Sequence, residues 1–155
     1  MKRRKETKYT VVHCSATERG QNFDADNIRD WHLKRGWSDV GYHYVIPRDG
    51  RIQIGRPMGV IGAHVRGFNS VSVSICLVGG KAKGSNRGEN NFTTKQFAAL
   101  ETLLRFLRLV YTESVILGHR DLSLDANGDG KITREEWIKE CPCFDVKQFV
   151  RDLGI

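Results

Sequence analysis

The chain has 155 residues, of which 39% are hydrophobic and 28% are charged. This composition excludes a disordered or fibrous protein, and the length fits one domain with a real core. The 25 lysines and arginines outnumber the 18 acidic residues, giving a net charge of +7. Such a charge favours polyanionic partners, namely nucleic acid, an anionic membrane or an acidic cell-wall polymer, although a basic surface that only aids solubility fits equally well.

The N-terminal segment carries a run of basic residues at positions 2–5, and no long apolar stretch follows it. We therefore expect neither a signal peptide nor a membrane span anywhere in the chain. The basic run itself is expected to be a solvated tail rather than an arm that binds nucleic acid.

In chain order, residues 8–15 are rich in β-branched side chains and predict a strand. Residues 24–35 predict a helix, because an aspartate able to cap it stands first and a glycine follows. Two apolar runs then flank an Asp-Gly dipeptide, which predicts a hairpin with strands over 42–48 and 51–55. Residues 71–78 alternate and then become continuously apolar, which predicts a central strand.

The second half begins with the glycine-rich polar segment 79–91, for which we expect a surface loop. It lacks the Gly-Lys-Ser/Thr ending of a phosphate-binding loop. A threonine followed three residues later by a glutamine opens a predicted helix over 93–112. A short strand over 115–119 and a capped helix over 145–153 complete the chain. The predicted fold class is a single α/β domain, with a mixed sheet of about five strands flanked by helices.

Residues 121–138 carry a calcium-binding pattern. An EF-hand loop needs Asp at position 1, Asp or Asn at 3 and 5, Gly at 6, an apolar residue at 8 and Glu at 12. Every specified position matches, namely Asp125, Asn127, Asp129, Gly130, Ile132 and Glu136. At position 7, Lys131 would contribute its backbone carbonyl. Since no helix precedes the loop, we expect a calcium clip with only an exit helix, over 133–140. An acidic turn that caps this helix is the alternative.

Histidines and cysteines supply the other candidate metal ligands. Zinc binds imidazole nitrogen and thiolate sulfur in tetrahedral sites, and catalytic zinc keeps one position for water. No helical His-Glu-x-x-His motif is present, so a site would be assembled from distant segments. The side chains available are His13, His32, His43, His64, His119, Cys141 and Cys143. By residue type alone, lone histidines are more often ordinary packed or surface residues than metal ligands.

The cysteines are expected to be ligands or buried thiols rather than a disulfide framework. Cys141 and Cys143 are too close in sequence to bridge comfortably. Cys14 and Cys76 read as small buried hydrophobic residues. Trp31 and Trp37 are expected to pack in the core, with stacking on sugar as the alternative.

Six segments of the chain, taken together and in order, carry a resemblance to a known family. They are VVHCSAT (11–17), WHLKRGWSDVGYHYVIPRDG (31–50), GAHVRGFNSVSVSICLVGG (62–80), NFTTKQ (91–96), GHRD (118–121) and KECPCFD (139–145). The ordered set resembles the zinc-dependent N-acetylmuramoyl-L-alanine amidases of the phage-lysozyme type, in the type-2 amidase family that includes peptidoglycan recognition proteins. The resemblance covers residues 9–150. The segment between His119 and Cys141 is longer than this family leads us to expect, so we describe residues 121–138, which carry the calcium pattern, as an insertion.

The resemblance implies a fold and a site as well as an activity. It implies zinc bound by His13, His119 and Cys141 with water as the fourth ligand, catalytic assistance from Tyr42 and Lys139, and a substrate contact from His64. Zinc lowers the pKa of bound water to about 7, which supplies hydroxide to attack the amide between N-acetylmuramic acid and L-alanine. Lys139 would stabilise the oxyanion, and Tyr42 would orient the water or bond the tetrahedral centre. The role of Cys143 stays open: it is either a core thiol or the ligand in place of Cys141.

Peptidoglycan and its muropeptides are thus the expected partners, with no nucleic acid, and we expect a monomeric endolysin. It would stay in the cytoplasm until release and then act on the cell wall. A calcium ion in the insertion would hold the segment with Lys139 and Cys141 in place, since ordering a backbone residue costs roughly 1–2 kcal/mol. One alternative is a non-catalytic recognition module, which loss of the cysteine ligand would favour. Another is a regulator that binds nucleic acid or a polymerase, which no feature requires.

Overall fold

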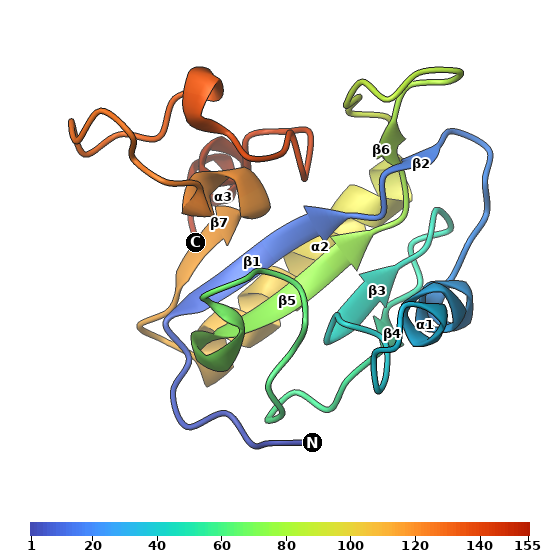
Figure 1. Ribbon diagram of the computed structural model, residues 1–155, viewed down its shortest axis with the longest axis horizontal. Coiled ribbons are helices and arrows are strands. Elements are labelled where there is room, and N and C mark those ends of the chain that lie inside the picture. Colours follow the sequence, from blue (N-terminus) through green and yellow to red (C-terminus); the bar gives the residue numbers. More distant parts are fainter.

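A five-stranded sheet runs through the centre of the computed structural model, which describes residues 1–155 (Figure 1). Across the sheet the strands are β4 (Gln53–Ile54), β3 (Tyr44–Ile46), β5 (Ser72–Leu77), β1 (Tyr9–Cys14) and β7 (Val115–Gly118). All neighbours pair in parallel except β4, which is antiparallel to β3. The predicted mixed sheet is therefore confirmed, with shorter hairpin strands than the sequence indicated.

Two further short strands pair in parallel beyond the end of the central sheet. They are β2 (Thr17–Glu18) and β6 (Gly80–Lys81). The prediction that residues 79–91 form only a loop was wrong for β6. In β6, Gly80 pairs with Thr17, which lies 63 residues earlier (80 − 17), and the local glycine-rich composition does not reveal this partner.

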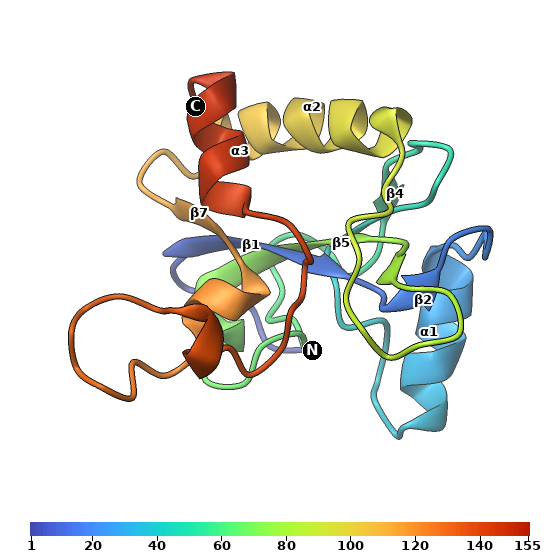
Figure 2. The ribbon, with the colours of Figure 1, turned by 90° about the horizontal axis from the view of Figure 1, so that it is seen from above.

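Helices cover both faces of the sheet, with α2 (Thr94–Val110) and α3 (Val146–Leu153) on one face and α1 (Ala25–Lys34) on the other (Figure 2). The inner side of α2 buries four leucines at helical spacing, Leu100, Leu103, Leu104 and Leu107. Burying one such side chain contributes roughly 1.5–3 kcal/mol, so this face fixes α2 on the sheet. The predicted capping box at its first turn is confirmed, with Thr93 Oγ1 accepting from Gln96 N at 3.1 Å.

The face under α1 holds a smaller apolar cluster, which includes Ile28, Val45 and the fully buried Cys76. Asp24 caps α1 and accepts hydrogen bonds from Asp26 N and Asn27 N. This helix therefore begins one residue after the aspartate, as the sequence predicts. None of the helices is both long and apolar enough to cross a membrane.

The basic N-terminal run is not wholly solvated, so that prediction was wrong at Arg4. Its guanidinium donates to Met58 O at 2.6 Å, Val60 O at 3.2 Å and Ser72 O at 3.2 Å. It also lies over the ring of Tyr111, 5.5 Å from the centroid. These carbonyls lie 54 to 68 residues further along the chain, so only the folded chain brings them to Arg4.

The insertion between β7 and α3 projects from the body of the molecule (Figure 2). The predicted exit helix over 133–140 was wrong, because only a 3₁₀ turn, Arg134–Glu136, forms there. Ile138 N donates to Ser123 Oγ at 3.0 Å instead of to a helix carbonyl. Ile138 is also 71% exposed, so no apolar face stabilises a helix whose nucleation is costly.

Candidate active site

Two histidines meet at the carboxyl edge of the sheet, where ligand sites of parallel sheets commonly lie. His13 stands near the end of β1, and His119 follows β7 directly. The parallel register pairs Val12 with Gly118, which places the two histidines side by side. Their ring centroids are 4.6 Å apart.

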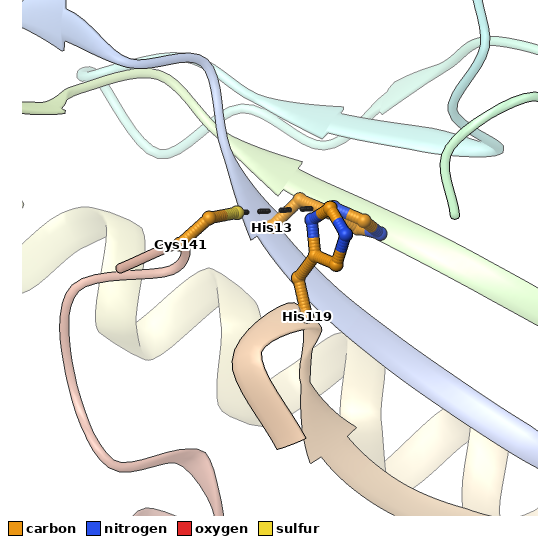
Figure 3. Close-up of side chains that lie close together, drawn as sticks. All are labelled: His13, His119 and Cys141. Carbon is orange, nitrogen blue, oxygen red and sulfur yellow. Dashed lines mark hydrogen bonds between the residues drawn. The ribbon is translucent and has the colours of Figure 1, made fainter. Parts of the chain in front are cut away.

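Cys141 completes a three-residue group with these histidines, although it comes from the irregular segment before α3 (Figure 3). Gly118 permits this approach, since a Cβ there would lie 2.7 Å from Pro142 Cδ. Arg120 N donates to Cys141 O at 2.9 Å, and Cys14 N donates to Cys141 Sγ at 3.2 Å. The backbone on both sides of the cleft thus holds the thiol in place.

The spacing of this group fits a tetrahedral zinc ion. One nitrogen from each of His13 and His119 and the Cys141 sulfur lie within 4.8 Å of one another. His13 Nδ1 is 3.8 Å from Cys141 Sγ, close to the roughly 3.6 Å expected between nitrogen and sulfur ligands of one zinc ion. Burial lowers the pKa of His13 well below its ordinary value, and burial and then the Lys139 charge lower that of His119 to about 4. Both imidazoles are therefore neutral at pH 7, with lone pairs for a metal.

Cys143 lies outside this group, in contact with other partners. Its thiol donates to Gly80 O at 3.1 Å and lies 3.9 Å from Cys14 Sγ. All four cysteines are free. The structure therefore brings Cys141, and not Cys143, to the two histidines.

The three residues line a cleft of about 240 Å³ that also contains Tyr42, His64 and Lys139. The Tyr42 ring lies 5.2 Å from the His13 ring. Burial raises the pKa of Tyr42 well above 10, so its hydroxyl keeps the proton and can donate a hydrogen bond. No aspartate or glutamate lines this cleft, and its charged side chains are the cations Arg35 and Lys139. The arrangement favours negative charge at the reacting centre.

A second hollow of about 420 Å³ shares Lys139 and Cys141 with the cleft as lining residues and reaches the segment that contains β6. A larger hollow of about 490 Å³, beside Arg48 and the start of α1, shares no residue with either part. Size alone therefore does not identify the site, because the candidate metal ligands line the smaller cleft.

The other two histidines are held by hydrogen bonds within the protein. His32 Nδ1 accepts from Gly41 N at 2.8 Å, which fixes the backbone just before Tyr42. His43 Nδ1 accepts from Ser74 N at 3.1 Å, while its Nε2 donates to Val60 O at 2.8 Å. The sequence analysis did not single out Arg35, which lines the cleft. It lies within the segment WHLKRGW (31–37), part of the family resemblance.

The residues of the calcium pattern lie together in the exposed insertion, apart from the cleft. The Asp125 carboxylate accepts from Gly128 N at 2.7 Å and Gly130 N at 2.8 Å. Glu136 accepts from Ala126 N at 2.9 Å and Thr133 N at 2.8 Å. These backbone bonds, chiefly that from Thr133, lower the pKa of Glu136. The loop is thus folded around the first and last positions of the pattern.

Comparison with known proteins identifies the family. The profile of the family described as N-acetylmuramoyl-L-alanine amidase (Amidase_2) matches residues 3–141. The chain belongs to this amidase family. The endolysin of Enterobacteria phage K11 is 42% identical to this amidase. The match covers 96% of the chain described here and 89% of the phage protein. This amidase is therefore an enzyme that hydrolyses the N-acetylmuramoyl-L-alanine bond of peptidoglycan.

Solved structures of similar proteins agree with this assignment. The Ph2119 endolysin from a Thermus scotoductus bacteriophage matches with a TM-score of 0.72 and 29% identity, covering 100% of this amidase and 90% of that chain. The amidase LysC from Clostridium intestinale matches with a TM-score of 0.72 and 25% identity. This match covers 97% of the chain described here and 87% of the LysC chain. The single α/β domain and five-stranded mixed sheet are thus those of the family.

Proposed function

We propose that this amidase is zinc-dependent and that His13, His119 and Cys141 hold the metal. The observation that carries the proposal is the convergence of these three ligand atoms within 4.8 Å at the floor of the cleft. Two neutral imidazoles and one thiol, with no carboxylate in the cleft, form a donor set that suits zinc. When bound, zinc supplies Lewis-acid chemistry that lowers the pKa of a water to about 7 and polarises a carbonyl.

The chain's own residues supply the rest of the chemistry. The Lys139 ammonium stabilises the negative charge that develops on the amide carbonyl oxygen in the transition state. The Tyr42 hydroxyl, protonated because it is buried, donates a hydrogen bond that orients the water or the tetrahedral centre. His64 lines the same cleft, and its contact with substrate is part of the proposal.

The substrate we propose is intact cell-wall peptidoglycan, as for a phage endolysin. Lys139 and Cys141 line two neighbouring hollows, which offers room for a polymer on both sides of the reacting centre. The net charge of +7 would attract an anionic wall at long range. The 42% identity to a protein named as an endolysin supports the same role here.

Digestion of purified sacculi tests this function directly. We expect new N-terminal L-alanine without new reducing sugar ends, because an amidase cuts the lactyl amide and leaves the glycan intact. New reducing ends would indicate a glycosidase instead. If folded, zinc-loaded protein released neither product but retained muropeptides, the recognition-module alternative would replace the amidase.

We propose in addition that the insertion binds calcium as a structural ion. The support is the complete match to the loop pattern at Asp125, Asn127, Asp129, Lys131 and Glu136, together with the bonds that shape the loop around Asp125 and Glu136. The ion would hold the segment that leads to Lys139, without the helix that the sequence indicated. A cation–π contact already joins the two ends of the insertion, because Arg120 Cζ lies 4.1 Å from the centroid of the Trp137 ring.

Calcium is predicted to raise the thermal stability of the wild-type protein at millimolar concentration or below, the range of known calcium loops. Glu136→Gln removes a charged oxygen of the twelfth position and is expected to abolish that rise. Glu135→Gln, a neighbouring exposed residue outside the pattern, is the matched control and should keep it. Isothermal titration that detected no calcium binding by the wild type would contradict the proposal.

A further inference from the structure

A chain of hydrogen bonds leads from the backbone to the buried side of His13. Ser72 Oγ donates to Phe68 O at 2.7 Å, and this carbonyl can only accept. The single Ser72 proton is thereby used, so Ser72 can only accept from His64 Nε2, which lies 3.2 Å from its oxygen. The proton of a neutral His64 must therefore sit on Nε2.

The chain of hydrogen bonds continues from His64 to His13, the candidate metal ligand. With its proton on Nε2, His64 presents a lone pair at Nδ1, which lies 3.0 Å from His13 Nε2. His13 must donate there, so its own proton sits on Nε2. Its remaining lone pair is then at Nδ1, the atom that faces the Cys141 sulfur at 3.8 Å.

Packing holds His64 rigidly in this position. The backbone amides of His64 and Val65 both donate to Asn69 Oδ1, at 2.8 and 2.9 Å. A Cβ at Gly62 would lie 2.6 Å from His64 Cδ2, so the neighbouring backbone closes on the ring. The His64 ring is therefore fixed with Nε2 toward Ser72 and Nδ1 toward His13.

We propose that His64 and Ser72 are positioning residues that fix the tautomer and orientation of His13, so that Nδ1 of His13 is held ready to bind zinc. This inference rests on the proposed zinc site. It gives His64 a role through His13, since both of its ring nitrogens are engaged within the protein. Any contact of His64 with the substrate is then limited to its ring carbons.

The test measures zinc affinity by competition with a chromogenic chelator, using the full chain stripped of metal. His64→Leu removes the acceptor and is expected to weaken zinc binding roughly 10–100-fold, the usual effect of losing an outer-shell partner. His64→Asn places an amide oxygen near the position of Nδ1 and should restore most of the affinity. Urea unfolding of the metal-free proteins shows whether each variant is folded.

Ser72→Ala provides a second variant with a matched control on the same strand. Ser72 and Ser74 are both fully buried in β5, but Ser74 bonds to His43 instead of His64. Ser72→Ala should weaken zinc binding, because the His64 proton loses its partner and the opposite tautomer competes. Ser74→Ala should leave the affinity unchanged.

Nitrogen NMR of the wild type reads the tautomers directly, without any variant that could misfold. We expect protonated Nε2 and unprotonated Nδ1 in both His13 and His64. Zinc binding as tight in folded His64→Leu as in the wild type would overturn the inference, as would equal effects of the two serine variants. Loss of binding in His13→Ala alone, with His64→Leu unaffected, would leave the zinc site standing and remove only the positioning role. A wild type that bound no zinc would overturn both.

Discussion

Replacement of Cys141 by serine is expected to abolish zinc retention and to lower amidase activity by at least about 10³-fold, since metal catalysis supplies several kcal/mol of transition-state stabilisation. A hydroxyl stays protonated where the thiol ionises on binding the metal, so the group loses its only anionic ligand. Zinc content by atomic emission and release of N-terminal L-alanine from sacculi are the two measurements.

Cys143→Ser is the matched control for this prediction, because it changes the same residue type two positions away. Cys143 Sγ contacts Gly80 O and Cys14 Sγ rather than the histidines. We expect this variant to keep its zinc and nearly full activity, with some loss of stability from the altered contacts. If Cys143→Ser lost the metal while Cys141→Ser retained it, the assignment of the ligand would be reversed.

Substitution of Lys139 by methionine is expected to lower kcat by roughly 10²–10³-fold, the usual effect of removing one oxyanion stabiliser. Methionine keeps the apolar length of the side chain but removes the only cationic side chain that lines both hollows. Because the interaction is made in the transition state, kcat and kcat/KM should fall together. Soluble muropeptides are the substrate of choice, since they allow both constants to be measured.

The zinc content of Lys139→Met should equal that of the wild type, which separates loss of transition-state stabilisation from loss of the metal. Lys83→Met, at an exposed position outside both hollows, removes one charge from the protein and serves as the control for net charge. Equal activity of Lys139→Met and the wild type would exclude Lys139 from the chemistry. An equal loss in Lys83→Met would show that only the overall charge matters.

Local patterns were sufficient for most helices and strands of this protein. The capping residues Asp24, Thr93 and Asp145 stand directly before the three observed helices, because a side chain bonds the nearby free amides whatever the rest of the fold does. Local patterns failed where a distant partner decides the structure. The insertion helix did not form because Ile138 N bonds to Ser123, and β6 formed because it meets β2.

The fold class, the family and the residue types able to bind a metal could all be inferred from the sequence. It could not say which of two cysteines two residues apart would reach the histidines. That choice depends on the close packing of Pro142 against Gly118 and on the backbone bond from Cys14 to Cys141, contacts between segments far apart in the chain. Likewise, the family resemblance implied a substrate contact for His64, and only the structure shows that its two ring nitrogens face His13 and Ser72. Residue type sets what a side chain can do, but the direction of its lone pairs and protons is set by neighbours that only the tertiary structure supplies.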